Sequence, residues 1–355
     1  MEKLRWGIVG TADIARQNWR AIFNSGNSIV TAVASRSIER SKQFIKTCQA
    51  ENKFEVQPKA YSNYEQLIDA PDIDAVYIPL PTGLRKEWVL RTAKAGKHVL
   101  CEKPCGINLN DVQEMVETCQ QNKVQFMDGV MFMHNPRLQR IRKVLDDSQS
   151  IGQIKRISSM FSFRAPEDYL RTNIRLHSEL EPTGCLGDLG WYNIRFSLWA
   201  MKWHVPYAVT GRILSQRGGK TSPAPTPTDF SGELIFSNDT SADFYCSFLT
   251  AFQQWSTISG TKGSLSIPDF VHPVNIHEPS FDVNNIEARV KCCNCTSEHT
   301  ESRIHAQDTL MIRNFVNQIC SGQLNKEWPL MAVTTQRVLD ACFKSAKNDS
   351  KLTLL

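Results

Sequence analysis

The stretch Leu4-Arg-Trp-Gly-Ile-Val-Gly-Thr-Ala-Asp-Ile-Ala15 decides how the first part of the chain folds. Its apolar first half predicts a short strand, Leu4–Val9, and residues 15–24 predict a helix. Between them, Gly10, Ala12 and Ala15 stand where a G-x-G-x-x-G loop has its three glycines. The first glycine of the motif, here Gly10, permits the tight turn, and the third position, here Ala15, needs a small residue for close helix–strand packing. The second position is where the backbone approaches a pyrophosphate, and there Ala12 departs from the pattern. The loop predicts a dinucleotide site of degenerate form, with the helix N-terminus holding a phosphate.

The residues that follow continue to alternate between strand and helix patterns. Strands separated by helices of ten to fifteen residues predict a parallel sheet with right-handed crossovers. We therefore expect a dinucleotide-binding domain over residues 1–128. The expected strands are 4–9, 29–34, 75–80, 98–101 and 124–127, and the expected helices are 15–24, 37–49, 64–69, 85–96 and 110–122.

The end of the second strand bears on which nicotinamide cofactor binds. An NAD site has Asp or Glu near this position to bond the ribose 2′-hydroxyl, whereas this chain has Ser35 and Arg36. An arginine can stack on adenine and pair with a 2′-phosphate. The plainer alternative is a surface arginine at the start of the next helix. We expect NADP(H) to be preferred over NAD(H).

The strand His98–Cys101 ends in Glu102-Lys103-Pro104. The carboxyl ends of the strands are where open α/β sheets bind ligands. Pro104 fixes its own φ and biases Lys103 away from helical geometry. A lysine there can polarise or protonate a substrate oxygen, although a charged residue after a strand is more often simply solvated.

After residue 128 the pattern changes, and we expect a second domain over residues 129–355. Successive strand patterns without helices between them predict an antiparallel sheet. Residues 221–228 form a proline-rich loop within this domain. The expected strands are 154–163, 207–214, 230–236, 241–248, 254–259 and 263–267; helices are expected after Pro136, at about 305–321 and at 331–346.

The stretch 182–199 contains glycines at 184, 187 and 190 before an apolar helix. Asp188 and Tyr192 are four residues apart, which places them on one helical face. Taken alone, the stretch is typical of an ordinary helix start with a buried tyrosine. A catalytic role for the pair requires a ligand surface that also includes Lys103.

Composition excludes several classes of function. The net charge of +5 is spread over 355 residues, so neither nucleic acid nor a membrane surface is an expected partner. No apolar run is long enough for a membrane span, and the charged N-terminus leaves no room for a signal peptide, so we expect a cytoplasmic protein.

Eleven scattered cysteines indicate reduced thiols. Cys292, Cys293 and Cys295 with His299 match no standard zinc spacing, and we expect no metal. Four further polar residues are weak cleft candidates, for which structural partners are expected: His134, Arg164, Arg175 and His177.

Three motifs coincide: 10–15 after the first strand, Glu102-Lys-Pro104, and Gly187-Asp-Leu-Gly-Trp-Tyr192. Together they resemble the Gfo/Idh/MocA family of oxidoreductases over nearly the whole chain. The stretch Met127-Asp-Gly-Val-Met-Phe-Met-His-Asn-Pro-Arg137 is most similar to plant-type members. Among characterised groups, the resemblance is to the trans-1,2-dihydrodiol and D-xylose dehydrogenases.

The resemblance implies an α/β fold: an N-terminal Rossmann domain, then a C-terminal α/β domain with a large, open-faced, mostly antiparallel sheet. It implies a homodimer through that sheet and a small-molecule substrate such as a sugar, polyol, dihydrodiol or carbonyl compound. By position, Lys103, Asp188 and Tyr192 would be catalytic. The implied cofactor-binding residues are Gly10, Thr11, Ala12, Asp13, Ile14, Ser35, Arg36, Leu80, Pro81, Thr82, Glu102 and Lys103.

The expected reaction is reversible hydride transfer between nicotinamide and a CH–OH/C=O carbon. A nearby ammonium lowers the pKa of a phenol, so Lys103 would bring Tyr192 closer to acid–base range, and either residue could transfer the proton. Two alternatives stay open: reduction of a C=C or C=N bond, as in biliverdin reductase, and a catalytically silent NADP-binding regulator. Glycoside cleavage with tightly held NAD is disfavoured by Arg36.

Overall fold

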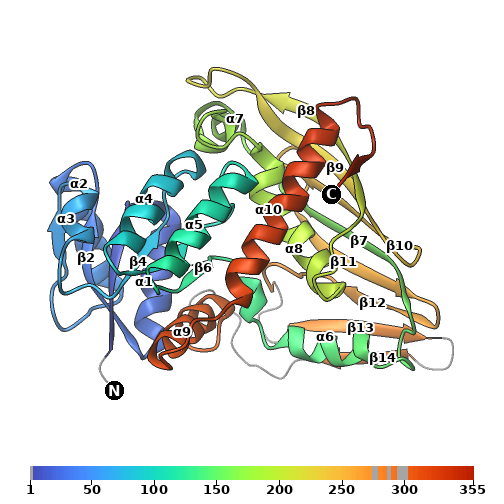
Figure 1. Cartoon of the computed structure of the whole chain (residues 1–355), viewed down its shortest axis with the longest axis horizontal. Helices are drawn as coiled ribbons and strands as arrows, with labels where there is room; N and C mark the ends of the chain where they lie inside the picture. Colours follow the sequence, from blue (N-terminus) through green and yellow to red (C-terminus); the bar gives the residue numbers. More distant parts are fainter. Residues whose placement is uncertain (1–2, 274–278, 286–288, 294–302) are drawn as a thin grey trace. The chain divides into compact units, whose positions relative to one another are not determined.

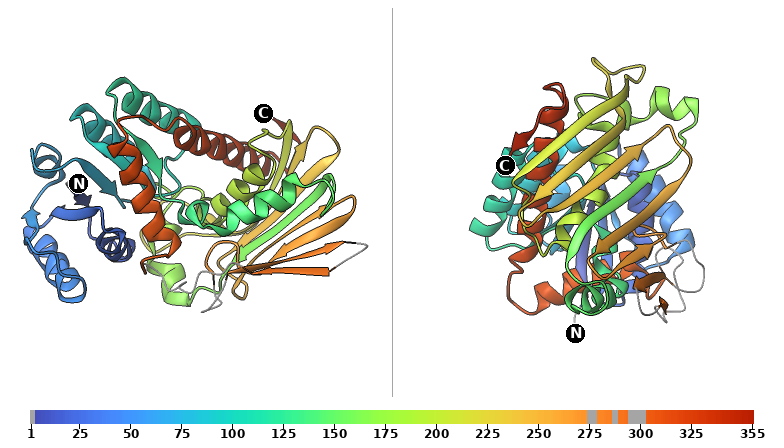
Figure 2. Two further views of the ribbon diagram at one scale, coloured as in Figure 1. Left: turned by 90° about the horizontal axis from the view of Figure 1, so that it is seen from below. Right: turned by 90° about the vertical axis from the view of Figure 1, so that its right-hand side faces the viewer.

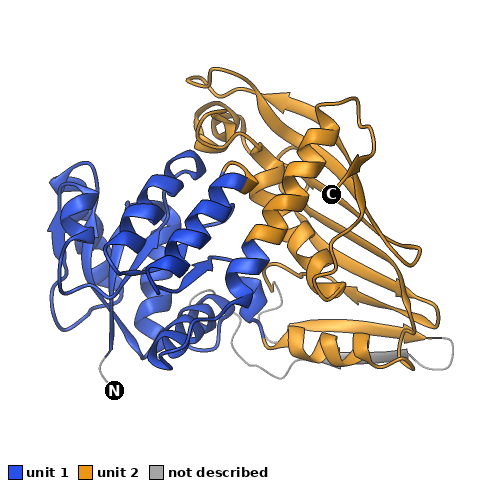
Figure 3. Cartoon of the chain, viewed as in Figure 1, with its two compact units in different colours: residues 1–106, 110–135, 298–332 blue, residues 107–109, 136–297, 333–355 orange. Residues whose placement is uncertain are grey.

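The computed structural model describes residues 3–273, 279–285, 289–293 and 303–355, with the backbone alone for 289–293. The chain forms two compact units (Figure 3). Unit 1 comprises Met1–Gly106, Asn110–Asn135 and Glu298–Ala332; unit 2 comprises Ile107–Leu109, Pro136–Ser297 and Val333–Leu355. The sequence predicts a single boundary at residue 128, whereas unit 1 of the structure also includes the late segment Glu298–Ala332.

Unit 1 contains a parallel sheet, as predicted. The strand order is β3-β2-β1-β4-β5-β6, and every neighbouring pair is parallel. The order reverses between β1 and β4, which is the switch point where such sheets bind ligands at their carboxyl ends. The strands are β1 (Leu4–Val9), β2 (Ser28–Ala34), β3 (Lys59–Tyr61), β4 (Ala75–Ile78), β5 (His98–Cys101) and β6 (Phe126–Asp128).

The helices of unit 1 include one from the late segment. α9 packs on α1: Arg313 Nε donates to the Ser25 carbonyl at 3.0 Å. The Phe315 ring lies 5.4 Å from that of the fully buried Trp6, so this segment supplies part of the unit's core. The helices are α1 (Asp13–Ser25), α2 (Ile38–Glu51), α3 (Tyr64–Ile68), α4 (Thr82–Lys94), α5 (Leu109–Gln121), the 3-10 turn η1 (Met131–His134) and α9 (Gln307–Cys320).

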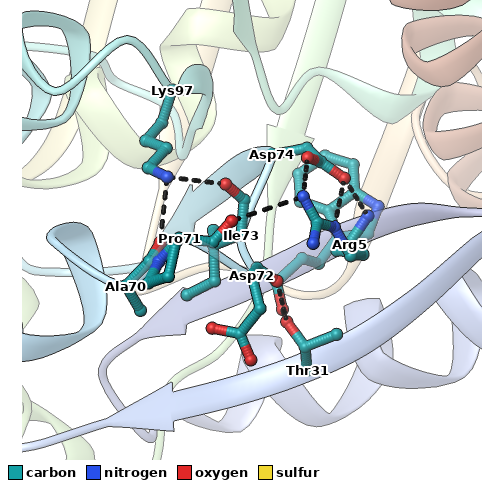
Figure 4. Close-up of polar contacts among 9 residues, drawn as sticks. Arg5, Thr31, Ala70, Pro71, Asp72, Ile73, Asp74 and Lys97 are labelled. Atoms are coloured by element: carbon teal, nitrogen blue, oxygen red, sulfur yellow. Dashed lines mark hydrogen bonds and ion pairs between the residues drawn. The ribbon is translucent and has the colours of Figure 1, made fainter.

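The amino-terminal edge of this sheet is closed by a polar network (Figure 4). Arg5 donates through its side chain to both carboxylate oxygens of Asp74, at 2.6 and 3.0 Å, and through its backbone N–H at 2.9 Å. Lys97 Nζ donates to the carbonyls of Ala70 and Ile73 at 2.9 and 2.8 Å. These bonds satisfy backbone acceptors of the loop that enters β4, so the network has a structural role.

Unit 2 contains the large sheet, which is mostly antiparallel, as predicted. Its order is β14-β13-β12-β11-β7-β10-β9-β8-β15, and among the described strands β7 and β10 alone pair in parallel. The strands are β7 (Ile154–Ser162), β8 (Ala208–Arg217), β9 (Thr226–Phe236), β10 (Thr240–Ser247), β11 (Gln253–Gly260), β12 (Gly263–Ile267), β13 (Ser280–Asn285), β14 (Arg289–Cys293) and β15 (Thr353–Leu354).

One face of the large sheet is covered by helices and the other is not (Figures 1 and 2). α8 is buried over almost its whole length, which matches its apolar sequence. Strand side chains alternate accordingly between buried and half-buried positions. The helical elements are α6 (Arg137–Asp146), α7 (Glu167–Thr172), the 3-10 turn η2 (Ile174–Leu176), the π-helical turn η3 (Leu186–Gly190), α8 (Trp191–Ala200) and α10 (Glu327–Ala346), whose first turns belong to unit 1.

Several elements differ from the sequence prediction. β9 begins at Thr226, inside the stretch expected to be a proline-rich loop. Pro227 pairs with Gln216 of β8 beside a register shift, and β10 pairs with β9 only as far as Asp229. The proline therefore stands at an irregular strand end, where it is tolerated. The sequence patterns did not predict β3, α7, β13, β14 or β15, most of which are short.

Candidate active site

Gly10 organises the turn between β1 and α1. Its φ of +110° is one that glycine adopts at little cost, and a Cβ here would lie 3.1 Å from Leu80 Cδ2. Its N–H donates to the Ala34 carbonyl at 2.8 Å, which ties the turn to the end of β2. The positive φ, together with the tight contact with the end of the Leu80 side chain, favours glycine at this position.

The first turn of α1 carries most of the predicted phosphate loop. Thr11 and Ala12 are half-buried, whereas Asp13 and Ile14 are exposed. Ala12 is the N-cap, and no side chain caps the turn among the described residues. Uncapped amides at a helix N-terminus suit an anion. Ala15 is fully buried, which fits the role of the small third residue in the loop motif.

Ser35 and Arg36, at the end of β2, have different environments. Ser35 is buried; its hydroxyl donates to the Ser37 carbonyl at 2.6 Å and accepts from Ser41 Oγ at 3.0 Å. These bonds give Ser35 a role within the turn. Arg36 is exposed. Its position after β2 leaves the guanidinium accessible to a ligand phosphate.

The predicted residues Leu80, Pro81 and Thr82 are joined to the Glu-Lys-Pro turn by Arg85, which the sequence analysis did not single out. Arg85 is buried, and its Nε donates to the Leu80 carbonyl at 2.7 Å. One terminal nitrogen donates both to Thr82 Oγ1, at 3.0 Å, and to the Pro104 carbonyl. The start of α4 and the residues after β5 are therefore held together by one guanidinium.

Glu102 lies in a buried hydrogen-bonded chain. Asn18 Nδ2 donates to Tyr77 Oη at 2.8 Å, and Tyr77 Oη donates to Glu102 Oε1 at 2.7 Å. The other oxygen of Glu102 accepts from the Lys103 backbone N–H at 3.2 Å. Burial, and next the Glu102 carboxylate, hold the pKa of Tyr77 well above its ordinary value, so the phenol stays a donor. Lys103 is itself buried, and its bond to Pro104 is cis.

In unit 2, Asp188 lies in the middle of the π-helical turn Leu186–Gly190 rather than in a regular helix start. Gly184 precedes it with a φ of +49°, and a Cβ there would meet the Pro227 carbonyl oxygen at 2.1 Å. The chain therefore passes against the first residues of β9 before the turn. Single π turns of this kind are frequent at functional sites.

Asp188 belongs to a group of charged side chains. Arg175 contacts Glu181 Oε1 through one terminal nitrogen, at 2.8 Å, and Asp188 Oδ1 through the other, at 3.2 Å. The side chains of Glu181 and Asp188 are 3% and 12% exposed, so both carboxylates are largely removed from water. Burial, and next the Asp188 carboxylate, raise the pKa of Tyr169 above its ordinary value.

Tyr192 is buried in the first turn of α8, and its ring lies edge-on to Phe161 at 5.5 Å. The following residue fixes this turn to the sheet, because Asn193 Nδ2 donates to Ser159 Oγ on β7 at 2.9 Å. Asp188 and Tyr192 thus belong to unit 2, whereas Glu102 and Lys103 belong to unit 1.

The weaker candidates have the following surroundings. His134 Nδ1 pairs with Asn314 Nδ2 at 3.1 Å, and His177 Nδ1 accepts from the Glu179 N–H at 3.4 Å. Arg164 is exposed. The side chains of Cys292 and Cys293, and residues Cys295 and His299, lie outside the described part of the structure. Within the described part, no three His, Cys, Asp or Glu residues are placed to hold a metal ion.

Family models match both units. Residues 4–130 match the model described as "Oxidoreductase family, NAD-binding Rossmann fold". Residues 138–266 match the GFO/IDH/MocA C-terminal domain, and residues 208–354 match the family's C-terminal alpha/beta domain. The chain belongs to the Gfo/Idh/MocA family. It is an oxidoreductase with a nicotinamide-dinucleotide-binding Rossmann domain, and the predicted fold is confirmed.

Three curated relatives of this family member extend over most of its length. A dTDP-3,4-didehydro-2,6-dideoxy-alpha-D-glucose 3-reductase from Actinomadura kijaniata is 26% identical, covering 97% of this chain and 96% of its own. D-xylose 1-dehydrogenase (NADP(+)) 2 from Haloferax volcanii is 25% identical, with 99% and 100% covered. Trans-1,2-dihydrobenzene-1,2-diol dehydrogenase from Xenopus laevis is 28% identical, with 86% and 89% covered.

Solved structures of the family share the fold at lower identity. A 3-ketoreductase from Actinomadura kijaniata, in complex with NADP and TDP-benzene, has a TM-score of 0.84 at 24% identity, covering 97% of this chain and 98% of its own. An aldose-aldose oxidoreductase from Caulobacter crescentus, complexed with glycerol, has a TM-score of 0.84 at 20% identity over the full length of both. Among the described residues of this chain, none of the helices combines the length and hydrophobicity of a transmembrane span.

Proposed function

We propose that the protein is an NADP(H)-dependent oxidoreductase that transfers a hydride between nicotinamide and a CH–OH/C=O carbon of a sugar, cyclic polyol, dihydrodiol or related carbonyl compound. The observation that carries the proposal is the buried Lys103, which follows β5 at the carboxyl edge of the parallel sheet. Its neighbour Glu102 is fixed by the Asn18–Tyr77 chain, and Arg85 holds the turn to the start of α4. The names of the curated relatives supply the substrate classes.

The residues of the first turn suit a dinucleotide. Gly10 permits the tight turn, and the amides of α1 carry no side-chain cap among the described residues. We infer that Gly10, Thr11, Ala12, Asp13 and Ile14 lie along the pyrophosphate. Further along the chain, Leu80, Pro81, Thr82, Glu102 and Lys103 would border the cofactor. When bound, the nicotinamide supplies or accepts the hydride.

The proposed chemistry assigns one task to each of three residues. Lys103 donates a hydrogen bond to the reacting oxygen and favours the phenolate of Tyr192, since an adjacent cation lowers the pKa of a phenol. Tyr192 or Lys103 moves the proton between that oxygen and the protein. Asp188 orients Lys103 or accepts from a substrate hydroxyl. A Tyr192→Phe variant separates the two proton donors, because turnover survives it only if Lys103 carries the proton.

We propose that NADP(H) is preferred because Arg36, and no acidic residue, stands at the end of β2 and is exposed. A guanidinium pairs well with a phosphate dianion. In fluorescence titrations, Arg36→Met should weaken NADPH binding at least about tenfold more than NADH binding, which corresponds to about 1.4 kcal/mol. The exposed Arg40 in α2 offers a matched control, Arg40→Met. An equal loss for both cofactors would remove the 2′-phosphate role from Arg36.

The substrate class is tested by screening sugars, polyols, dihydrodiols and aldehydes with NADP(H), following nicotinamide absorbance. The proposal predicts turnover of at least one class. Activity only on compounds with a C=C or C=N bond would show that the protein reduces such bonds and not a carbonyl group. If NADPH binds but no compound is turned over, the result would favour the alternative function, a regulatory protein that binds the cofactor without catalysis.

We also propose that the uncovered face of the large sheet forms a homodimer. Met160 on β7 stands directly between Trp255 on β11 and Tyr245 on β10, and all three are half-exposed on this face. Beside them, Arg156 pairs with Glu233 at 2.6 Å and with Asp243 at 2.8 Å. An apolar patch rimmed by charges is typical of a protein–protein interface.

A further inference from the structure

We propose that Arg175 is a positioning residue for the reaction: it holds the Asp188 carboxylate in place. The proposal rests on the function proposed above for Asp188. Arg175 lies outside the three motifs that identify the family, on the 3-10 turn Ile174–Leu176, thirteen residues before Asp188. Its role follows from the contacts of its side chain and from the anchoring of its backbone.

The guanidinium lies between two carboxylates. Its two terminal nitrogens reach Glu181 Oε1 at 2.8 Å and Asp188 Oδ1 at 3.2 Å. Glu181 is the more buried of the two acids, with 3% of its side chain exposed against 12% for Asp188. Two carboxylates that share one cation depend on it, because without the cation they repel each other in a medium that screens poorly.

The backbone of Arg175 is anchored at the same place as that of the turn carrying Asp188. The Arg175 N–H donates to Asn173 Oδ1 at 3.0 Å, and its carbonyl accepts from Thr226 Oγ1 at 3.2 Å. Thr226 is the first residue of β9, and its neighbour Pro227 is the residue against which Gly184 packs. The start of β9 thus fixes both the guanidinium and the entry to the π-helical turn.

Tyr169 completes the surroundings of the carboxylate. Its ring lies edge-on to Phe163 at 5.7 Å and to Phe248 at 5.9 Å, which fixes the direction of the phenol. Burial and then the Asp188 carboxylate raise the pKa of Tyr169, and the Arg175 guanidinium opposes them. Among the described residues, one cation, two carboxylates and a phenol with a raised pKa come together.

The test is a double-mutant cycle in which Arg175→Met and Asp188→Asn are made singly and together. Arg175→Met should lower kcat/KM about 10- to 100-fold, mainly through kcat, as expected when a reacting group is misplaced. In the Asp188→Asn background the same change should cost less than about threefold, because no charge is left to position. Arg175→Lys keeps the positive charge but lacks the two terminal nitrogens of the guanidinium, so it should recover part of the lost kcat/KM.

Arg171→Met is the matched control, since Arg171 is exposed on α7 and loses the same charge. NADPH affinity should be unchanged in every variant. Equal losses from Arg175→Met in both backgrounds, or no recovery in Arg175→Lys, would overturn the positioning role.

A measurement that needs no turnover separates this proposal from the proposed function. Arg175→Met should lower the thermal unfolding midpoint, and adding Asp188→Asn should restore at least half of the loss, because only one of the two neighbouring side chains then carries a negative charge. Strictly additive midpoints would overturn the proposal even if the enzyme is active. A recovered midpoint in a protein that turns over none of the screened compounds would support the pairing and reject the reaction.

Discussion

At the scale of single residues, the candidate site depends on two buried polar side chains outside the three motifs, Asn18 and Tyr77. Tyr77 accepts from Asn18 and donates to Glu102, and all three are buried. A buried carboxylate without donors is costly, so this chain explains how Glu102 is held in place next to Lys103.

Tyr77→Phe tests that chain. The substitution removes one hydroxyl and leaves both Asn18 and Glu102 short of a partner. We expect the free energy of unfolding to fall by about 1–3 kcal/mol, measured by denaturant unfolding. Tyr207→Phe is the control, because Tyr207 is 52% exposed and should change stability by less than about 0.5 kcal/mol. A Tyr77→Phe protein as stable as the wild type would show that the chain does not hold Glu102.

Sequence reasoning predicted the motif residues but not their supports. Gly10 and Lys103 stand at fixed positions relative to strands, and the strand pattern was visible. Arg85 was not distinguishable from a surface arginine, because its partner Pro104 is distant in sequence. Arg175 was one of four weak candidates, and its contacts with Glu181 and Asp188 were not predicted. The role of Asp188, Tyr192 and Lys103 in the reaction stays a prediction.

At the scale of elements, the turn before α8 shows why the three glycines of that stretch are not equivalent. Gly184 combines a φ of +49° with a backbone carbonyl 2.1 Å from where its Cβ would lie. Neither the chain nor β9 can move aside without displacing the turn that carries Asp188.

Gly184→Ala should therefore destabilise the protein strongly. We expect a loss of about 2–4 kcal/mol in the free energy of unfolding, from the left-handed conformation and the overlap with Pro227 together. Gly26→Ala is the control: Gly26 has a φ of +80° but open space around it, so only about 1–2 kcal/mol should be lost. Equal losses for the two variants would show that the turn yields to the methyl group.

The loop into β4 predicts a pH dependence of stability. Burial alone would raise the pKa of Asp74, but the hydrogen bonds and the charge of Arg5 outweigh it and lower that pKa. The stabilisation is therefore fully present above about pH 4 and is lost as the pH falls through the lowered value.

Asp74→Asn should reduce stability at neutral pH, and the difference from the wild type should shrink on acidification. Unfolding midpoints measured from neutral pH down to about pH 3 check this. Glu117→Gln, at an exposed position on α5, should show no comparable trend. A difference that stays constant with pH would mean that the ion pair does not stabilise the loop.

Strand and helix types were predictable wherever an apolar period was long. β3 and β15 are too short to leave a period, and the start of β9 was hidden by proline. The π-helical turn has no sequence signature that separates it from an ordinary helix start, since its geometry depends on packing against β9.

At the scale of the whole molecule, the two units interleave along the chain. A linear reading did not show that α9 packs on α1, because an amphipathic pattern reveals a buried face but not its partner. The uncovered sheet face, by contrast, was expected from the family resemblance, and the alternating burial of its strands agrees with it.

The dimer proposed for that face has a direct test. In sedimentation experiments the wild-type protein should have a molar mass of about twice the 40.3 kDa of one chain. Trp255→Glu places a charge in the apolar patch and should therefore reduce the mass to that of the monomer. Val56→Glu is the control, because Val56 is 76% exposed in unit 1. A dimer that survives Trp255→Glu would place the interface elsewhere.

The central claim is that Lys103 takes part in hydride transfer between a nicotinamide and a carbonyl or carbinol carbon. The most direct measurement is single-turnover nicotinamide absorbance of Lys103→Met beside NADPH titration of the same protein, with exposed Lys94→Met as the matched control. For Lys103→Met we expect NADPH affinity within about threefold of the wild type and turnover reduced at least about 1000-fold, whereas Lys94→Met should stay active. A Lys103→Met protein that binds NADPH and still turns over its substrate at the wild-type rate would contradict it.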